Sequence, residues 1–158
     1  MLLDGSLDAV LSARPPNAFL QQPDVVKRLI PDYRTAEADY WSRTGIFPIM
    51  HVMAIKRTVF EQNPWIATNL LEGFEAAKER SVERAKDITA SSFPLPWISD
   101  YAAQSEQIMG PDIWPYGIEH NHKTLSAFTQ YAFEQGVTHR KMEVEELFPL
   151  QVQAKVKV

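Results

Sequence analysis

A glycine, a proline and a histidine interrupt an apolar stretch at residues 43–51 and limit how this part of the chain can fold. Gly45 permits a backbone turn that other residues avoid. Pro48 fixes φ and has no N–H to donate to a β-ladder. His51 then precedes residues 52–56, a short apolar run typical of a buried strand. We therefore expect a turn followed by a strand that carries a titratable imidazole at its start.

Composition limits the class of protein. The chain has 158 residues, of which 45% are hydrophobic, so it can form one domain with a core or part of a larger domain. A net charge of −4 and dispersed basic residues argue against a nucleic-acid partner. There is no cysteine, which excludes disulfides and thiolate chemistry. No apolar stretch approaches the roughly 18 residues of a membrane span, and the first residues do not resemble a signal peptide. We expect a soluble, cytoplasmic protein.

Turn signals and apolar periodicity predict the elements. Residues 7–12 form a second short apolar run that resembles a strand, and the prolines after Arg14 end it. In the helix expected at residues 65–84, three-to-four spacing relates Ile66, Leu70, Phe74 and Ala77, which gives the helix one buried face. The stripe of Trp65, Leu70 and Phe74 is expected in the core. The sequence predicts helices or helical turns at residues 25–30, 35–40, 58–62, 65–84, 97–108, around 125–132 and at 144–148.

Strands that alternate with amphipathic helices predict an α/β fold. The two expected strands are too few for a sheet that is stable by itself. Further strands would therefore come from a partner chain or from a longer protein.

Six motifs lie along the chain, at residues 8–16, 43–51, 63–65, 114–117, 135–138 and 145–148. Together they resemble the 4,5-dihydroxyphthalate decarboxylase family, whose fold is similar to that of the type II periplasmic binding proteins. Residues 44–51 are the most specific piece, and the resemblance covers residues 4–148.

The resemblance implies two α/β lobes with the ligand in the cleft between them. This chain corresponds to the C-terminal half of that fold. Residues 1–14 would end the second lobe and form a crossover strand, residues 15–150 would complete the first lobe, and residues 151–158 would form a tail. A homo-oligomer could then complete the fold.

The activity that the resemblance implies is the non-oxidative decarboxylation of a hydroxylated aromatic dicarboxylate, 4,5-dihydroxyphthalate, to protocatechuate. This reaction needs no organic cofactor. It needs a general acid that protonates the ring carbon and cations that hold the anionic substrate. His51 is the predicted proton donor, because histidine titrates near the operating pH. The alternative is a histidine hydrogen-bonded at a strand end.

Two residues near the first expected strand are candidate substrate ligands. Arg14 follows that strand, and its guanidinium could hold a carboxylate through two hydrogen bonds. Alternatively, Arg14 is a surface residue stacked on Phe19 or Tyr33. The hydroxyl of Ser12 could donate to the substrate or could simply end the strand.

Two further candidates lie in the rest of the chain. Arg43 could form a second carboxylate clamp, although pairing with Asp39 or Glu37 is equally consistent with the sequence. Tyr116 lies in an aromatic loop and could contact a substrate hydroxyl, whereas Trp114 in the same loop is expected in the core.

Glu119, His120 and His122 resemble part of a divalent metal site. No third ligand of clear spacing accompanies the histidines, and a helix N-terminus capped by Asn121 with solvated histidines explains the pattern better. No metal is therefore predicted. A small aromatic carboxylate is the expected partner of the chain. The alternatives are a non-enzymatic protein that binds a small organic anion, and a truncated, inactive half.

Overall fold

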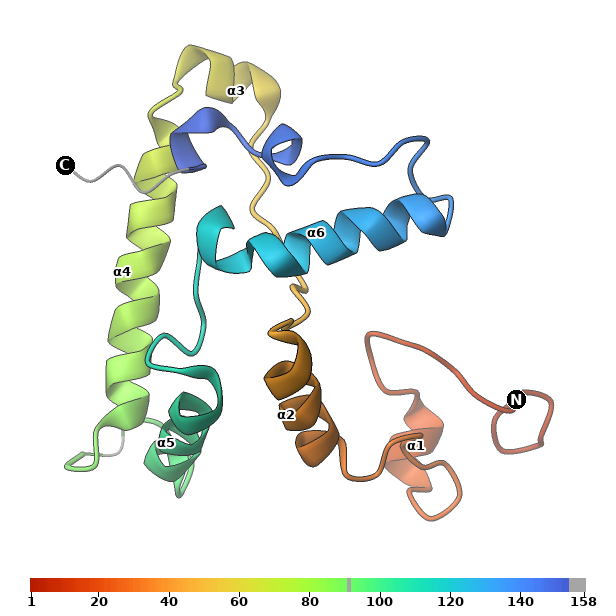
Figure 1. Ribbon diagram of the computed structural model, residues 1–158. Coiled ribbons are helices and arrows are strands. Elements are labelled where there is room, and N and C mark those ends of the chain that lie inside the picture. The colour runs from red at the N-terminus through yellow and green to blue at the C-terminus, as the bar shows by residue number, and fades with distance from the viewer. Residues whose placement is uncertain (91, 154–158) are drawn as a thin grey trace. The chain divides into compact units, whose positions relative to one another are not determined.

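The computed structural model describes residues 1–90 and 92–153, and every regular element in these ranges is a helix (Figure 1). Internal contacts divide the chain into two compact units, one formed by Met1–Asp39 and one that begins at Tyr40. The predicted boundaries at residues 14 and 150 stay predictions. The α-helices are α1 (Asn17–Gln21), α2 (Tyr33–Thr44), α3 (Arg57–Gln62), α4 (Ile66–Lys86), α5 (Ile98–Met109) and α6 (Ile118–Glu134), followed by the 3-10 helices η1 (Val144–Leu147) and η2 (Leu150–Val152).

The predicted α/β fold of the type II periplasmic-binding-protein kind is wrong, because the described residues contain no strand. Residues 7–12 and 52–56, expected as strands, are irregular. Both runs are short and apolar, and Leu11 and Val52 are largely exposed. A strand requires a ladder partner, and neither run has one in the described structure.

The predicted helices in the second half of the chain are confirmed as α4, α5 and α6, and the turn at residues 144–148 is confirmed as the 3-10 helix η1. The helices at residues 35–40 and 58–62 lie within α2 and α3. The helix predicted at residues 25–30 is wrong. The first helix is α1 instead, and Pro16 precedes it as the N-cap residue in an extended conformation (φ −65°, ψ 152°).

The N-terminal unit has no buried residue among those described. Its clearest tertiary contact is the guanidinium of Arg28, which lies 4.5 Å from the ring centroid of Tyr33 and 5.5 Å from that of Phe19. Arg28 therefore makes the aromatic contacts that the sequence suggested as an alternative role for Arg14.

In the C-terminal unit, α4 packs against α5 and η2, and α6 packs against η1. Ile118 and Leu125 on α6 form the main buried cluster with Val144 of η1, which is only 2% exposed, and Phe148 packs against them. α4 and α5 each bury a single small residue, Ala67 and Ala102.

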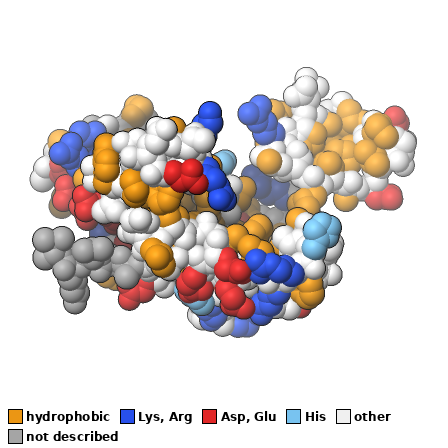
Figure 2. Space-filling view, turned by 90° about the horizontal axis from the view of Figure 1, so that it is seen from above, with side chains coloured by type: hydrophobic (Ala, Val, Ile, Leu, Met, Phe, Trp, Pro, Cys, Tyr) orange, Lys and Arg blue, Asp and Glu red, His pale blue; other side chains and the backbone are white. Residues whose placement is uncertain are grey.

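The predicted core stripe of α4 is wrong. Trp65 is 59% exposed and Phe74 is 41% exposed, while Leu70 lies on the wall of a cavity. Hydrophobic side chains also reach the surface at many places on the face drawn in Figure 2. No helix of the described residues has both the length and the apolar character that crossing a membrane requires.

Candidate functional site

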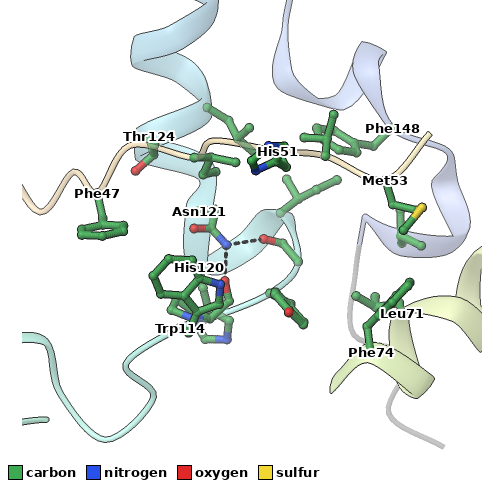
Figure 3. A pocket seen from close by; sticks show the side chains of 18 of the residues that line it. Phe47, His51, Met53, Leu71, Phe74, Trp114, His120, Asn121, Thr124 and Phe148 are labelled. Carbon is green, nitrogen blue, oxygen red and sulfur yellow. Dashed lines mark hydrogen bonds between the residues drawn. The ribbon is translucent and has the colours of Figure 1, made fainter. Parts of the chain in front are cut away.

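A cavity of about 540 Å³ lies within the C-terminal unit (Figure 3). Its volume falls in the range of small-molecule sites, about 300 to 1,000 Å³. Most of its wall is apolar, and the polar side chains on it include two imidazoles, a carboxamide and two hydroxyl groups. These polar residues are His51, Tyr116, His120, Asn121 and Thr124.

One wall of the cavity begins where α2 ends. Gly45 adopts φ +62°, a left-handed conformation that glycine enters without strain. Its N–H donates to the carbonyl of Trp41 at 2.6 Å. The hydroxyl of Thr44 donates to the carbonyl of Tyr40 at 2.6 Å and accepts from the N–H of Ile46 at 3.1 Å. The predicted turn at Gly45 is thus confirmed, and it directs the following residues along the cavity.

Residues 46–56, which we call the wall segment, run as coil from this turn to α3. Within the described structure, residues 47–55 make no backbone–backbone hydrogen bond. Phe47, His51 and Met53 of the wall segment all contribute to the cavity (Figure 3). His51 is exposed and has no hydrogen bond within the described part of the protein. The suggested alternative, an imidazole hydrogen-bonded at a strand end, is therefore not what the structure contains.

The aromatic loop at residues 113–117 forms the opposite wall and is held by Asn121. The carboxamide of Asn121 donates to the carbonyls of Pro115 at 2.8 Å and Gly117 at 2.9 Å. Trp114 meets Phe47 edge to face, with ring centroids 5.4 Å apart. Because Trp114 is 51% exposed and lines the cavity, its predicted core position is wrong. Asn121 acts inside α6 and does not cap its N-terminus.

A charged cluster supports Tyr116 from the side of α4. The ammonium of Lys78 hydrogen-bonds to Glu75 and lies 3.2 Å from Asp112. It also lies 5.2 Å from the ring centroid of Tyr116, within the range of a cation–π contact. Burial lowers the pKa of Lys78, but hydrogen bonds and charge interactions with Glu75 and Asp112 outweigh it, and the pKa lies above its ordinary value. Lys78 therefore stays charged and fixes the loop that carries Tyr116.

The two histidines of α6 have different surroundings. His120 lines the cavity. The Nε2 atom of His122 lies 3.2 Å from Glu145, and its Nδ1 atom lies 3.2 Å from the hydroxyl of Ser126. A search of the described residues finds no group of three His, Asp or Glu side chains that could hold a metal ion.

The other sequence candidates are not among the residues that line the cavity. Ser12 and Arg14 belong to the N-terminal unit, where the hydroxyl of Ser12 accepts from the N–H of Arg14 at 3.3 Å. The guanidinium of Arg43 lies over the ring of Tyr40, 5.6 Å from its centroid, and Arg43 does not line the cavity. The structure thus brings together His51 and Tyr116, while the predicted roles of Ser12, Arg14 and Arg43 stay predictions.

Sequence reasoning did not assign His120 and Thr124 to a ligand cavity. Together with Asn121 they occupy positions i, i+1 and i+4 of one helix, which is the spacing of a shared helical face. That spacing was a usable signal, since a face with three polar residues next to an aromatic loop is typical of a pocket lining.

The chain matches no family model. It is 33% identical over 148 residues to the 4,5-dihydroxyphthalate decarboxylase of Comamonas testosteroni. The match covers 94% of this chain and 45% of the relative, so the chain spans less than half of the length of that protein. This similarity agrees with the family resemblance of the sequence motifs.

Proposed function

We propose that this chain takes part in the non-oxidative decarboxylation of a hydroxylated aromatic dicarboxylate, with 4,5-dihydroxyphthalate as the substrate and protocatechuate as the product. The observation that carries the proposal is the 33% identity, along 94% of the chain, to a protein of that name. The enzyme class would then be that of a carboxy-lyase.

The cavity supports this proposal through its chemistry. Phe47 and Trp114 offer aromatic surface to a planar ring, and aromatic contacts of this kind favour stacked or edge-on ligands. The apolar wall excludes water from one side of the ligand. A carboxylate loses solvation in such surroundings, which favours its departure as neutral carbon dioxide.

In the proposed reaction, a ring hydroxyl para to the leaving carboxylate pushes electron density into the ring. The imidazolium of His51 donates its proton to the ring carbon that bears the carboxylate. The bond between that carbon and the carboxylate then breaks, its electron pair restores the aromatic ring, and carbon dioxide leaves. His51 suits this role because it faces the cavity and no other side chain occupies its ring nitrogens in the described structure.

The other proposed contacts position the substrate. The hydroxyl of Tyr116, on the cavity wall, would hydrogen-bond to a ring hydroxyl. Arg14 and Arg43 would bind carboxylates, and Ser12 would donate a hydrogen bond.

The test is to add 4,5-dihydroxyphthalate to the purified chain and to follow protocatechuate by chromatography. His51→Ala should lower turnover by at least about 100-fold, the usual contribution of a general acid. The same variant should change the binding affinity for the substrate little. His139→Ala is the matched control, because His139 is exposed and does not line the cavity.

If the wild-type chain binds the substrate and releases no product, the chain is a binding protein for a small organic anion and the enzymatic proposal is wrong. If product forms and His51→Ala turns over as fast as the wild type, the proton donor is another group.

A further inference from the structure

We propose that Lys123 is the residue that binds a ligand carboxylate at the mouth of the cavity, which makes the site selective for anionic aromatic compounds. This inference deepens the proposed function, because it names the group that recognises the charge of the substrate. It concerns binding alone, and it can be tested without any turnover.

The position of Lys123 follows from the shape of α6 and from Gly45. Lys123 lies on α6 between Asn121 and Thr124, both of which line the cavity. Its side chain extends toward the end of α2, and a Cβ atom added at Gly45 would lie 3.7 Å from its Nζ atom. Gly45 itself lines the cavity. Lys123 itself does not line the cavity, but its ammonium lies next to Gly45, which does, at the place where the wall segment begins.

Lys123 has no charged partner among the residues that the structure describes. The side chain is exposed, and none of the ion pairs of the described residues includes it. The other lysine near the cavity, Lys78, is in contrast held by Glu75 and Asp112. An unpaired ammonium next to an apolar cavity is a suitable partner for a carboxylate, since a charge-assisted hydrogen bond can form without displacing an internal partner.

The first turn of α6 also adjoins the cavity, because Gly117, Ile118 and His120 line it. This turn combines the positive end of the helix dipole with the acidic side chain of Glu119, which opposes it. The inference therefore rests on the ammonium of Lys123 and not on the helix end.

The experiment compares an anionic and an uncharged aromatic probe of similar shape, phthalate and dimethyl phthalate. Binding to the full chain is measured by calorimetry at low and at high salt. Lys123→Gln should weaken phthalate binding about fivefold at low salt, and the loss should shrink at about 1 M salt because the charges are screened. The affinity for dimethyl phthalate should stay the same, and Lys123→Arg should retain most of the phthalate affinity.

Lys141→Gln is the matched control, because Lys141 is an exposed lysine that neither lines the cavity nor lies beside Gly45. It should leave both affinities unchanged. Equal phthalate affinity in the wild type and in Lys123→Gln would overturn the inference, and so would an equal loss for the uncharged probe. If the phthalate affinities are equal but Lys123→Gln is less stable than the wild type, the role of Lys123 is to stabilise the C-terminus of α2, where a cation is also favourable.

The inference and the proposed function can fail separately. Selective loss of phthalate binding in Lys123→Gln without any protocatechuate from the wild type would support the inference and contradict the enzymatic proposal. Turnover by the wild type, with no effect of Lys123→Gln on phthalate affinity, would support the enzymatic proposal and contradict the inference.

Discussion

The α6–η1 pair and the wall segment are both apolar parts of the same unit, but they differ in how their polar groups are satisfied. α6 ends at Glu134, and just beyond Gly136 the N–H of Val137 donates back to the carbonyl of Ala132 at 2.8 Å. η1 begins with a capping box between Glu143 and Glu146. Within the described structure, residues 47–55 of the wall segment make no backbone–backbone hydrogen bond, and Met50, Val52 and Met53 are each more than 60% exposed.

This difference separates two uses of apolar residues. Around α6 and η1, apolar side chains are buried where the backbone is already hydrogen-bonded. Burial and hydrogen bonding therefore stabilise the same conformation. In the wall segment, apolar side chains line the cavity. The backbone of the segment remains open to water. A surface of this kind can adapt to a ligand, because few interactions must break when it moves.

The largest expected effect is the loss of stability when a side chain of the buried cluster is truncated. Leu125→Ala should lower the free energy of unfolding by about 3 kcal/mol, because it removes a side chain that is only 7% exposed. Met53→Ala in the wall segment should lower it by about 0.5 kcal/mol or less, since Met53 is 63% exposed. Urea unfolding followed by circular dichroism measures both values.

Equal losses in these two variants would mean that the wall segment is packed as firmly as α6. The comparison between the two regions would then be wrong. Phe128→Ala, on α6 but 63% exposed, is the control that separates burial from location in a helix, and it should behave like Met53→Ala.

The helices could be predicted because their signals are local. Asn63 and Pro64 precede α4, Gly136 follows α6, and the periodic apolar residues between such signals outline each helix. That residues 7–12 and 52–56 form no strand could not be predicted, because a strand depends on a partner elsewhere in the chain. Residues 52–56 have the composition of a strand, yet a short apolar run can belong to a strand, a buried helix or a coil.

The candidate site could be predicted only in part. His51 and Tyr116 were found from their residue types, and both line the cavity. Lys123 was missed because nothing in its local sequence distinguishes it. Its importance comes from the approach of its ammonium to Gly45, 78 positions away in sequence, and that is a property of tertiary structure.

Substitutions at two glycines test whether the turn that precedes the wall segment has a fixed conformation. Gly45→Ala should lower the free energy of unfolding by about 1 kcal/mol, because alanine is strained at φ +62°. The added Cβ would make only ordinary contact with Lys123, so the loss would come from the backbone. Gly73→Ala within α4 meets no atom within 4 Å and should raise stability by about 1 kcal/mol. If Gly45→Ala leaves the free energy of unfolding in urea unchanged, the turn rearranges freely and does not hold the first residues of the wall segment in one conformation.

The smallest expected effect concerns acid sensitivity of the α6–η1 region, which has an ion pair that the wall segment lacks. The guanidinium of Arg140 donates two hydrogen bonds of 2.8 Å to Glu146. These bonds, together with the N–H of Glu143, lower the pKa of Glu146 from its ordinary 4.5 to about 2.

A folded-state pKa below the unfolded value means that the ionised carboxylate stabilises the fold above about pH 4.5 and that this contribution disappears as the pH falls toward 2. Arg140→Gln should therefore lower the urea midpoint slightly at pH 6, and the difference from the wild type should vanish near pH 2. The ion pair is exposed to solvent, so the shift should be small and should decrease with salt. Arg80→Gln, an exposed arginine of α4, should show no such pH dependence. The difference in urea midpoint between Arg140→Gln and the wild type could instead stay constant from pH 6 to pH 2. That result would mean that Arg140 supports η1 by packing its side chain, and that the ionised carboxylate of Glu146 contributes nothing to stability.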